Sequence, residues 1–541
     1  MRKQPDIIKE GALTVPADGT GSHGGRYARV KWFCFSCILF AALVFYILNA
    51  TKSGLWYDEA VEYFYSKYMT GTVPGGLGTA NMFERIRITF QPPLYNILMF
   101  LWLQVFDSEF LFRLAGILVT LAGAGGIFLA VEEVLPGRIW SNAAVFFYLF
   151  SRGIVYYALE CAEYNLMLCF MAWAVWYFLR VLNREDMKSV IGFFAFSCLA
   201  LYSQYGAAFM IAGMCAAVLV RFAAAKKAAA VKRFLLAGIV SFAAAVIPLI
   251  FVFLIPQMGK QGSSSVSHTP VFVRGPVTDL ITGSGVMLRS MFGYYTYLGV
   301  LVLLLICCFG LFTKAKAVIY PALSVALAWL VYYIAVSCSF YGYNVTWNPG
   351  SFGTANLGGK YSFFFIPAVV VLCSAGLGVL SDRIKAKSLA AGKAVTVVIL
   401  ICFALYGAVE IYRTGIKGWK KDDDDVREIV SEWYDIEAYN KKTLLYQRED
   451  ALFNFYLIHD VRYSSSCSDN VEAADEWIRT ADYDLMKEKL DSMGYLSTDE
   501  FYFITSNSKG NPAFFSVMED EGYTAETIYS GQAAFYLMKK G

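Results

Sequence analysis

The first residues that could do chemistry follow the first apolar stretch of the chain, in the string Trp56-Tyr57-Asp58-Glu59-Ala60. A carboxylate held at the edge of a low-dielectric site has the proton affinity to act as a general base toward a hydroxyl group. Aromatic residues at a span end and an aspartate at a helix start are also common structural features. Asp58 and Glu59 are therefore candidate catalytic carboxylates only if other polar groups gather around them.

Other polar residues flank the apolar stretches instead of lying at their centres. Transporters and pumps usually keep their coupling carboxylates at the span centres, where this chain has almost no charge. In the topology that the basic residues predict, the flanking residues come out on the same face as Asp58. They are Gln91, Glu160, Tyr164, Gln204, Tyr205, Lys360 and Tyr361. The three histidines, His23, His268 and His459, are scattered and indicate no metal site by their spacing.

The composition excludes an ordinary soluble enzyme. Of the 541 residues, 57% are hydrophobic, 17% aromatic and 16% charged, whereas soluble domains carry about 25% charged residues. Apolar stretches long enough to span a bilayer recur along the first three quarters of the chain. The formal net charge of +3 is too even for a protein that grips nucleic acid through phosphate contacts, so we expect no nucleic-acid partner. The sequence predicts a multi-pass protein of the plasma (cell) membrane, surrounded by membrane lipids.

Basic residues near span ends mark the cytoplasmic side and so predict the topology. A polar, basic tail, 1–31, precedes the apolar run 32–50, and four later basic clusters lie at 180–188, 221–233, 314–316 and 383–393. If all four clusters face the cytoplasm, each apolar stretch between them crosses the membrane an even number of times. This parity predicts about eleven spans, with the N-terminus in the cytoplasm and the C-terminus outside.

Three apolar stretches need particular assignments for the parity to hold. Residues 140–157 and 164–181 form a predicted hairpin whose apex faces outside. The stretch 189–221 is too long for one span, so we expect two short spans with an outer turn at 204–206. The stretch 92–106 is short for a span, and we interpret it as an outer-surface or re-entrant helix that begins at Pro92 and Pro93.

The composition becomes polar and charged from Lys417 onward. Helical stretches alternate there with β-rich runs at 443–446, 501–505 and 534–538, which indicates a small soluble α/β domain. The sequence therefore divides into a cytoplasmic tail, 1–31, a membrane-embedded domain, 32–413, and an extracytoplasmic domain, 414–541. The expected fold class is an all-α polytopic membrane domain with surface helices, followed by a small α/β domain.

An ordered set of short motifs resembles one family of membrane enzymes. In chain order the motifs are Tyr57-Asp58-Glu59-Ala60, Gln91-Pro92-Pro93-Leu94-Tyr95, Arg113-Leu114, Tyr156-Tyr157-Ala158-Leu159-Glu160 with Tyr164, Leu201-Tyr202-Ser203-Gln204-Tyr205, and Lys360-Tyr361. This set resembles the polyprenyl-phosphate-sugar-dependent membrane glycosyltransferases of the GT-C superfamily, of the protein O-mannosyltransferase and aminoarabinose-transferase type. The resemblance covers roughly residues 30–410.

The resemblance implies an inverting glycosyltransferase that moves a sugar from a polyprenyl-phosphate carrier to an acceptor outside the cytoplasm. The acceptor is a glycan, lipid or protein of the cell envelope. By the same resemblance Asp58 is the base and Glu59 supports it. The residues expected to bind the donor and its phosphate are Lys360, Tyr361, Arg85, Arg87, Gln91 and Arg113. Those expected to line the cavity are Tyr57, Tyr95, Glu160, Tyr164, Gln204 and Tyr205. The lipid-linked sugar is a substrate, and we expect neither a cofactor nor a metal ion.

The chain departs from the family pattern at several basic positions. Ala162 and Gln204 stand where relatives often carry arginine and histidine, and Gln91 stands where some carry a basic residue. Phosphate binding is therefore redistributed or altered, and the sugar and carrier stay open. Lys360 also fits a lysine that snorkels at a span end, and Arg85 and Arg87 also fit the wet face of a surface helix.

Two other function classes stay open at this stage. A membrane transporter or lipid flippase fits the number of spans, although intramembrane charges or broken helices in matching halves are not evident in the sequence. A receptor-like scaffold that binds through its C-terminal domain would tolerate replacement of Asp58 and Lys360. A mutational scan of the outer loops separates the scaffold from the enzyme.

Overall fold

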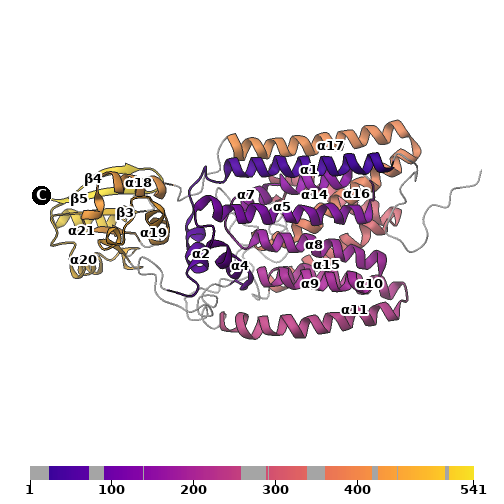
Figure 1. Cartoon of the computed structure of the whole chain (residues 1–541), viewed down its shortest axis with the longest axis horizontal. Helices are drawn as coiled ribbons and strands as arrows, with labels where there is room; N and C mark the ends of the chain where they lie inside the picture. Colours follow the sequence, from indigo (N-terminus) through magenta and orange to yellow (C-terminus); the bar gives the residue numbers. More distant parts are fainter. Residues whose placement is uncertain are drawn as a thin grey trace, which may run out of the picture. The chain divides into compact units, whose positions relative to one another are not determined.

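The computed structural model of the chain describes residues 24–71, 91–137, 139–257, 288–289, 291–337, 360–416, 425–446, 449–474, 476–479, 481–505 and 511–541 (Figure 1). The described residues of 1–50, 86–98 and 113–417 form one compact unit, here called the helical unit. Those of 51–85, 99–112 and 418–541 form a second, here called the tail unit. Each unit is described by itself.

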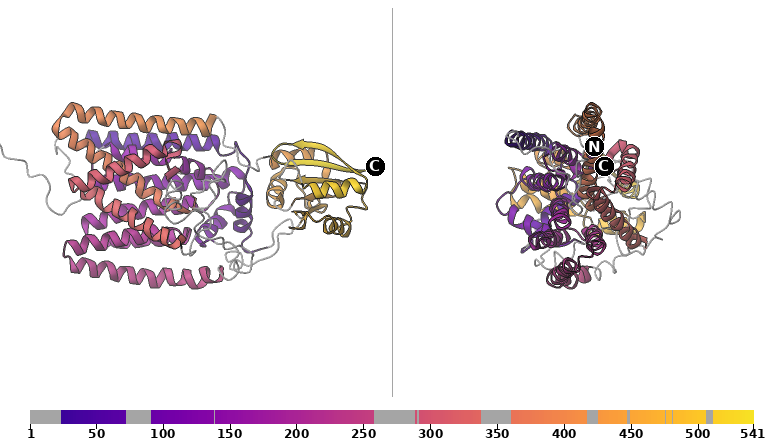
Figure 2. Two further views of the ribbon diagram at one scale, coloured as in Figure 1. Left: turned by 180° about the vertical axis from the view of Figure 1, so that it is seen from behind. Right: turned by 90° about the vertical axis from the view of Figure 1, so that its right-hand side faces the viewer.

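The helical unit is a bundle of long apolar helices that lie side by side, as the view along their axes shows (Figure 2, right). Its helices are α1 (Gly24–Asn49), α5 (Glu109–Val134), α6 (Trp140–Leu149), α7 (Arg152–Ala158), α8 (Tyr164–Arg184), α9 (Met187–Ser203), α10 (Ala207–Ala224), α11 (Ala228–Ser241), α14 (Thr296–Thr313), α15 (Lys316–Ser337), α16 (Ile366–Lys387) and α17 (Leu389–Ile411). Among the described residues, nine helices are long and apolar enough to cross a membrane. The predicted multi-pass helical domain is therefore confirmed.

Burial distinguishes central from peripheral helices. The most apolar window of the helix that contains α16 is 89% buried, whereas the window of the long helix Ala228–Gln257, which begins as α11, is only 6% buried. Close helix contact depends on small residues, because lipid tails are as apolar as leucine and give no hydrophobic drive for association. At Gly213 of α10, a Cβ atom would lie 2.3 Å from the carbonyl oxygen of Ser324 in α15. Only glycine lets these two helices approach so closely.

The predicted basic loops lie together at one end of the bundle. Lys31 pairs with Glu132 at 2.6 Å, and Arg184 pairs with the next residue, Glu133, at 2.8 Å. These contacts bring the start of α1 together with the ends of α5 and α8. Lys227 pairs with Glu185 at 2.5 Å, which adds the loop between α10 and α11. We call this part of the helical unit the basic end. The other ends of the same helices form what we call the opposite end.

Two of the three special stretches form as predicted. Residues 189–221 fold as two short helices, α9 and α10, which are joined at 204–206, and residues 94–103 form the short helix α4 (Leu94–Leu103). The expected continuous helix over 140–157 is wrong. The chain breaks there into α6 and α7, because Ser151 adopts an extended conformation (φ −73°, ψ 144°) and its hydroxyl bonds back to the carbonyl of Tyr148.

The tail unit contains a five-stranded mixed sheet in the order β2-β1-β3-β5-β4. The strands are β1 (Thr443–Leu445), β2 (Val471–Ala473), β3 (Glu500–Thr505), β4 (Tyr523–Ser530) and β5 (Ala534–Lys540). β1 pairs in parallel with β2 and β3, and β5 pairs antiparallel with β3 and β4. The predicted α/β domain is confirmed, with strands at the three predicted places. β2 and β4 were not expected, because β2 is short and β4 is mostly exposed and polar.

Four helices pack around this sheet: α18 (Val426–Asp435), α19 (Glu449–His459), α20 (Tyr483–Ser492) and α21 (Pro512–Asp520). Met486 of α20 and Phe514 of α21 are buried against Phe503 of β3 in the main core cluster. Trp433 of α18 is fully buried, and its indole N–H donates to the Thr443 hydroxyl at 3.0 Å. The tail unit also contains α2 (Tyr57–Lys67) and the segment 99–112, which lie far from its other parts in the sequence.

Candidate active site

The two predicted catalytic carboxylates share the first turn of α2 but have different surroundings. Glu59 is fully buried, and its Oε2 accepts a hydrogen bond from the backbone N–H of Trp56 at 3.1 Å. This contact belongs to a capping box that fixes the start of the helix. Asp58 is exposed. Glu59 therefore acts as a positioning residue in the fold, and Asp58 is the carboxylate that a substrate in solution or at a membrane surface can approach.

The tail unit holds the segment around Asp58 at both ends. Before α2, the backbone N–H of Leu55 donates to the Tyr456 hydroxyl of α19 at 2.5 Å, and the Arg427 guanidinium donates to the Thr51 carbonyl at 3.1 Å. Later in α2, the ring of Tyr63 packs edge-on against Phe455 of α19, with centroids 4.8 Å apart. The first turn of α2 is thus positioned by the C-terminal domain and not by its own helix alone.

Gln91 and Tyr205 are joined by a residue that the sequence analysis did not single out. Gln257 is buried at the end of the long apolar helix that begins as α11, and its amide N–H donates to the Gln91 carbonyl at 2.7 Å. Its Oε1 accepts a hydrogen bond from the Tyr205 hydroxyl at 2.7 Å. The side-chain oxygen of Gln91 is buried and has no hydrogen-bond partner among the described residues. The sequence signal that could have indicated Gln257 is its position, because it is a polar residue at the end of a long apolar run.

Glu160 and Tyr164 lie together with the 3₁₀ helix Lys360–Phe365 (η6). Glu160 is buried between α7 and α8, and its carbonyl accepts from the Asn165 amide at 3.3 Å. The ring of Tyr157 lies 4.9 Å from that of Tyr164 and 4.8 Å from that of Phe363 in η6. The aromatic contacts therefore bring the helix that begins at Lys360 beside the connection between α7 and α8. Asn165 was not singled out in the sequence.

Arg113 is among the largest fully buried side chains of the described chain, with 1% exposure. Its guanidinium donates to the Ala50 carbonyl, just beyond the end of α1, at 2.5 Å. A cation is favourable there because the last carbonyls of a helix carry partial negative charge. One turn later, Gly116 approaches the Glu160 carbonyl, so α5 and the α7–α8 connection are neighbours. Arg113 thus has a structural role whatever else it binds.

The remaining predicted residues differ in how far the structure describes them. Tyr95 of α4 and Gln204 are buried, and Tyr57 is partly exposed at the start of α2. Arg85 and Arg87 lie outside the described residues, and so do the side chains of Lys360 and Tyr361. Within the described part of the chain, no group of three or more histidine, cysteine or acidic side chains is placed to hold a metal ion.

A sequence comparison relates the middle of the chain to sugar transfer. Residues 90–251 match the family model of the dolichyl-phosphate-mannose-protein mannosyltransferases. No curated protein matches the chain significantly. The fold is similar to that of ArnT from Cupriavidus metallidurans, with 12% identity, a TM-score of 0.55, and coverage of 94% of this chain and 98% of that one.

The chain has the helical membrane-protein fold of ArnT, and one stretch of its sequence resembles a family of protein mannosyltransferases. A second structure of the same ArnT, bound to undecaprenyl phosphate, is also similar, with 13% identity, a TM-score of 0.55, and coverage of 96% of this chain and 98% of that one. An oligosaccharyltransferase of Archaeoglobus fulgidus, in complex with zinc and sulfate, has 13% identity and a TM-score of 0.50, and the match covers 92% of this chain and 72% of that one.

These comparisons favour the glycosyltransferase interpretation among the function classes that the sequence left open. The expected family resemblance and the helical membrane fold are confirmed. The transporter or flippase alternative is not favoured. The roles of the individual site residues stay predictions.

Proposed function

We propose that this glycosyltransferase takes a sugar from a polyprenyl-phosphate carrier and transfers it, with inversion, to a hydroxyl group of an envelope glycan, lipid or protein. The acceptor oxygen attacks the anomeric carbon, and the bond between that carbon and the phosphate oxygen breaks. Polyprenyl phosphate leaves, and Asp58 takes the proton of the acceptor hydroxyl. The match of residues 90–251 to dolichyl-phosphate-mannose-dependent enzymes and the similar fold solved with undecaprenyl phosphate support this donor class.

The single observation that carries the proposal is the contrast between Asp58 and Glu59. Glu59 is buried in the capping box, whereas Asp58, on the same helical turn, is exposed. The exposed Asp58 carboxylate is accessible to an acceptor hydroxyl, whereas the buried Glu59 carboxylate is not.

The direction of transfer follows from the distribution of basic residues. Lysines and arginines concentrate at the basic end, and such loops face the cytoplasm in most membrane proteins. We infer that the N-terminus is cytoplasmic, that transfer takes place on the extracytoplasmic face, and that the tail unit lies on that face. The tail unit fixes the segment that carries Asp58 and offers a folded surface for an acceptor.

The donor phosphate requires positive charge, because it leaves as an anion and needs no protonation. The residues proposed for this task are Lys360, Arg113, Arg85 and Arg87. Tyr361 and Gln91 lie beside them in the sequence motifs. The cavity-lining roles proposed for Tyr57, Tyr95, Glu160, Tyr164, Gln204 and Tyr205 rest on the resemblance of their motifs to those of the family. We propose that the reaction uses no cofactor and no metal ion.

The test is release of polyprenyl phosphate from a panel of polyprenyl-phosphate sugars by the purified full-length protein in nanodiscs. Asp58→Asn is expected to lower the rate by about 100-fold to 10,000-fold, the range of general base catalysis. The matched control is Asp484→Asn, because Asp484 is also an exposed acid in the first turn of a helix of the tail unit. Equal activity of wild type and Asp58→Asn would refute the proposed base. Release by neither protein, with acceptor extracts present and both proteins folded, would refute the donor class.

A further inference from the structure

A groove at the basic end is lined by two kinds of side chain. It lies between the end of α10, the turn 225–227 and the first three turns of α11, and it has a volume of about 730 Å³. Lys226, Lys227 and Lys232 contribute ammonium groups, and the remaining lining residues are apolar: Phe222, Ala223, Ala228, Val231, Leu235, Leu236 and Ile239. We call this feature the lysine groove.

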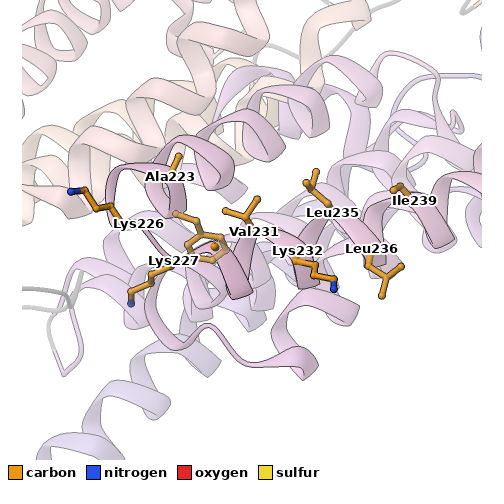
Figure 3. A pocket seen from close by; sticks show the side chains of 10 residues that line it. Ala223, Lys226, Lys227, Val231, Lys232, Leu235, Leu236 and Ile239 are labelled. Atoms are coloured by element: carbon orange, nitrogen blue, oxygen red, sulfur yellow. The ribbon is translucent and has the colours of Figure 1, made fainter.

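The two kinds of side chain are separated along α11. Figure 3 shows Lys226 and Lys227 toward one end of the groove, Val231 and Lys232 in the middle, and Leu236 and Ile239 toward the other end. The twelve residues from Ala228 to Ile239 rise by about 18 Å in a helix. This is close to half of a hydrocarbon core of about 30 Å, so the groove runs the depth of one leaflet.

The positive charge of the groove is only partly neutralised. Glu185 pairs with Lys227 at 2.5 Å. The adjacent Asp186 carboxylate accepts hydrogen bonds from the backbone N–H and the hydroxyl of Ser189, both at 2.8 Å. Within the part of the chain that the structure describes, Lys226 and Lys232 are exposed and have no ion-pair partner. The groove therefore has an excess of positive charge that a bound anion can neutralise.

The backbone adds to this charge. The turn is closed by hydrogen bonds from the N–H groups of Lys226 and Lys227 to the carbonyls of Ala223 and Phe222, both at 2.9 Å. α11 begins directly after it, and the N–H groups of Ala230 and Val231 donate back to the Lys227 carbonyl, so the first turn of the helix faces this turn. The start of a helix carries partial positive charge and favours anionic groups such as phosphate.

The apolar half of the groove is also unusual in its exposure. Leu235, Leu236 and Ile239 are 45%, 57% and 65% exposed, on the least packed of the apolar helices of the described chain. In a membrane protein such side chains face acyl chains. A ligand that matches both halves has an anionic head and a long apolar tail.

We propose that the lysine groove binds an anionic glycerophospholipid of the surrounding leaflet. Its phosphate contacts Lys226, Lys232 and the start of α11, and one acyl chain lies along Leu235, Leu236 and Ile239. This site lies at the basic end of the helical unit and does not depend on the proposed sugar transfer at the opposite end. Bound lipid supports α11, whose own protein contacts are few.

The experiment counts lipids that stay bound to the full-length protein in native mass spectrometry, during titration with phosphatidylglycerol and, separately, with phosphatidylcholine. The double variant Lys226→Gln/Lys232→Gln is expected to bind phosphatidylglycerol about 30-fold more weakly, because each of the two lysines contributes about fivefold at an anionic surface. The matched control is Lys385→Gln/Lys387→Gln, which removes two exposed lysines from the last turn of α16, also at the basic end. The control is expected to bind phosphatidylglycerol like wild type.

A second variant, Leu236→Asn, tests the apolar half without changing charge and is expected to shorten retention of phosphatidylglycerol. Glycerol phosphate, which has the head group and no acyl chains, should not displace the lipid. Equal weakening by the two lysine doubles would overturn the proposal, because the attraction would then belong to the whole basic end. Equal retention of both lipids, or no retained phosphatidylglycerol on wild type, would overturn it as well.

Discussion

The imidazole Nε2 of His459, at the end of α19, lies 3.3 Å from Oδ1 of Asp107 in the segment before α5. The Tyr63 hydroxyl of α2 donates to the same oxygen at 2.7 Å, and the Lys67 ammonium lies 3.0 Å from Oδ2. The other imidazole nitrogen faces the Phe455 carbonyl at 2.7 Å, so it carries a proton. One carboxylate therefore joins three segments of the tail unit, including the helix that carries Asp58.

Replacing Asp107 should loosen this junction. Asp107→Asn removes the ion pair with Lys67 and weakens the contact with the His459 imidazole. It is expected to lower the free energy of unfolding by about 1–2 kcal/mol, a small value because the carboxylate is 40% exposed. Thermal unfolding and limited proteolysis of the full-length protein measure the change. Asp484→Asn, which loses no such contact within the described part of the chain, should leave both unchanged. An equal melting temperature for Asp107→Asn and wild type would show that the junction adds no stability.

The same carboxylate predicts a pH dependence. Burial raises the pKa of Asp107, but hydrogen bonds from His459, Tyr63 and Lys67 outweigh it and hold the pKa well below its usual value. The stabilisation is thus fully present above about pH 4, where the unfolded chain is also ionised, and decreases as the pH falls further. The melting-temperature difference between wild type and Asp107→Asn should shrink from pH 5 toward pH 3. A difference that stays constant over this range would contradict the depressed pKa.

Arg113 allows a structural role to be separated from donor binding. Arg113→Met leaves the Ala50 carbonyl without the guanidinium and is expected to lower the free energy of unfolding by about 2–3 kcal/mol. If Arg113 also contacts the donor phosphate, the KM for donor rises in the folded fraction, whereas a purely structural role leaves KM unchanged. Steady-state kinetics at a temperature well below unfolding measure this. A variant as stable as wild type would contradict the buried hydrogen bond.

The contact between α10 and α15 predicts that replacing a glycine with alanine lowers the stability of the protein, which is opposite to the usual effect within a helix. Alanine favours an isolated helix over glycine by about 1 kcal/mol. At Gly213, however, the added Cβ would meet the Ser324 backbone oxygen at 2.3 Å, which cannot move aside as a side chain can. Gly213→Ala is expected to destabilise the protein by about 1–3 kcal/mol. Gly71→Ala, where no atom lies within 4 Å, should be neutral, and stabilisation by Gly213→Ala would show that the helices separate.

Much of the secondary structure was predictable because it depends on local sequence. The apolar lengths predicted α9 and α10 as two short helices, and the basic loops predicted which helix ends lie together. The break at Ser151 was missed, because the apolar stretch 140–157 gives no hydropathy signal for a change in one residue's backbone conformation. The exposed strand β4 was missed because its partner β5 supplies the pairing that its own sequence does not indicate.

The sequence predicted which residues belong to the candidate site, but it did not predict which of them contact one another. The order of the motifs singled out Asp58, Glu160 and Tyr205, but it did not distinguish the buried, capping Glu59 from the exposed Asp58. Gln257 bonds to Gln91 across 166 positions of sequence. The spacing of residues within either segment does not predict that contact.

The sequence by itself determined that the chain is a multi-pass membrane protein with a polar α/β tail and with motifs that resemble membrane glycosyltransferases, because hydropathy, charge and short motifs are properties of consecutive residues. Only the tertiary structure decided that α2 and the segment around Asp107 pack with that tail, through His459, Tyr456 and Arg427. The physical reason is that such contacts depend on which helix faces meet after folding, and chain order does not specify those faces.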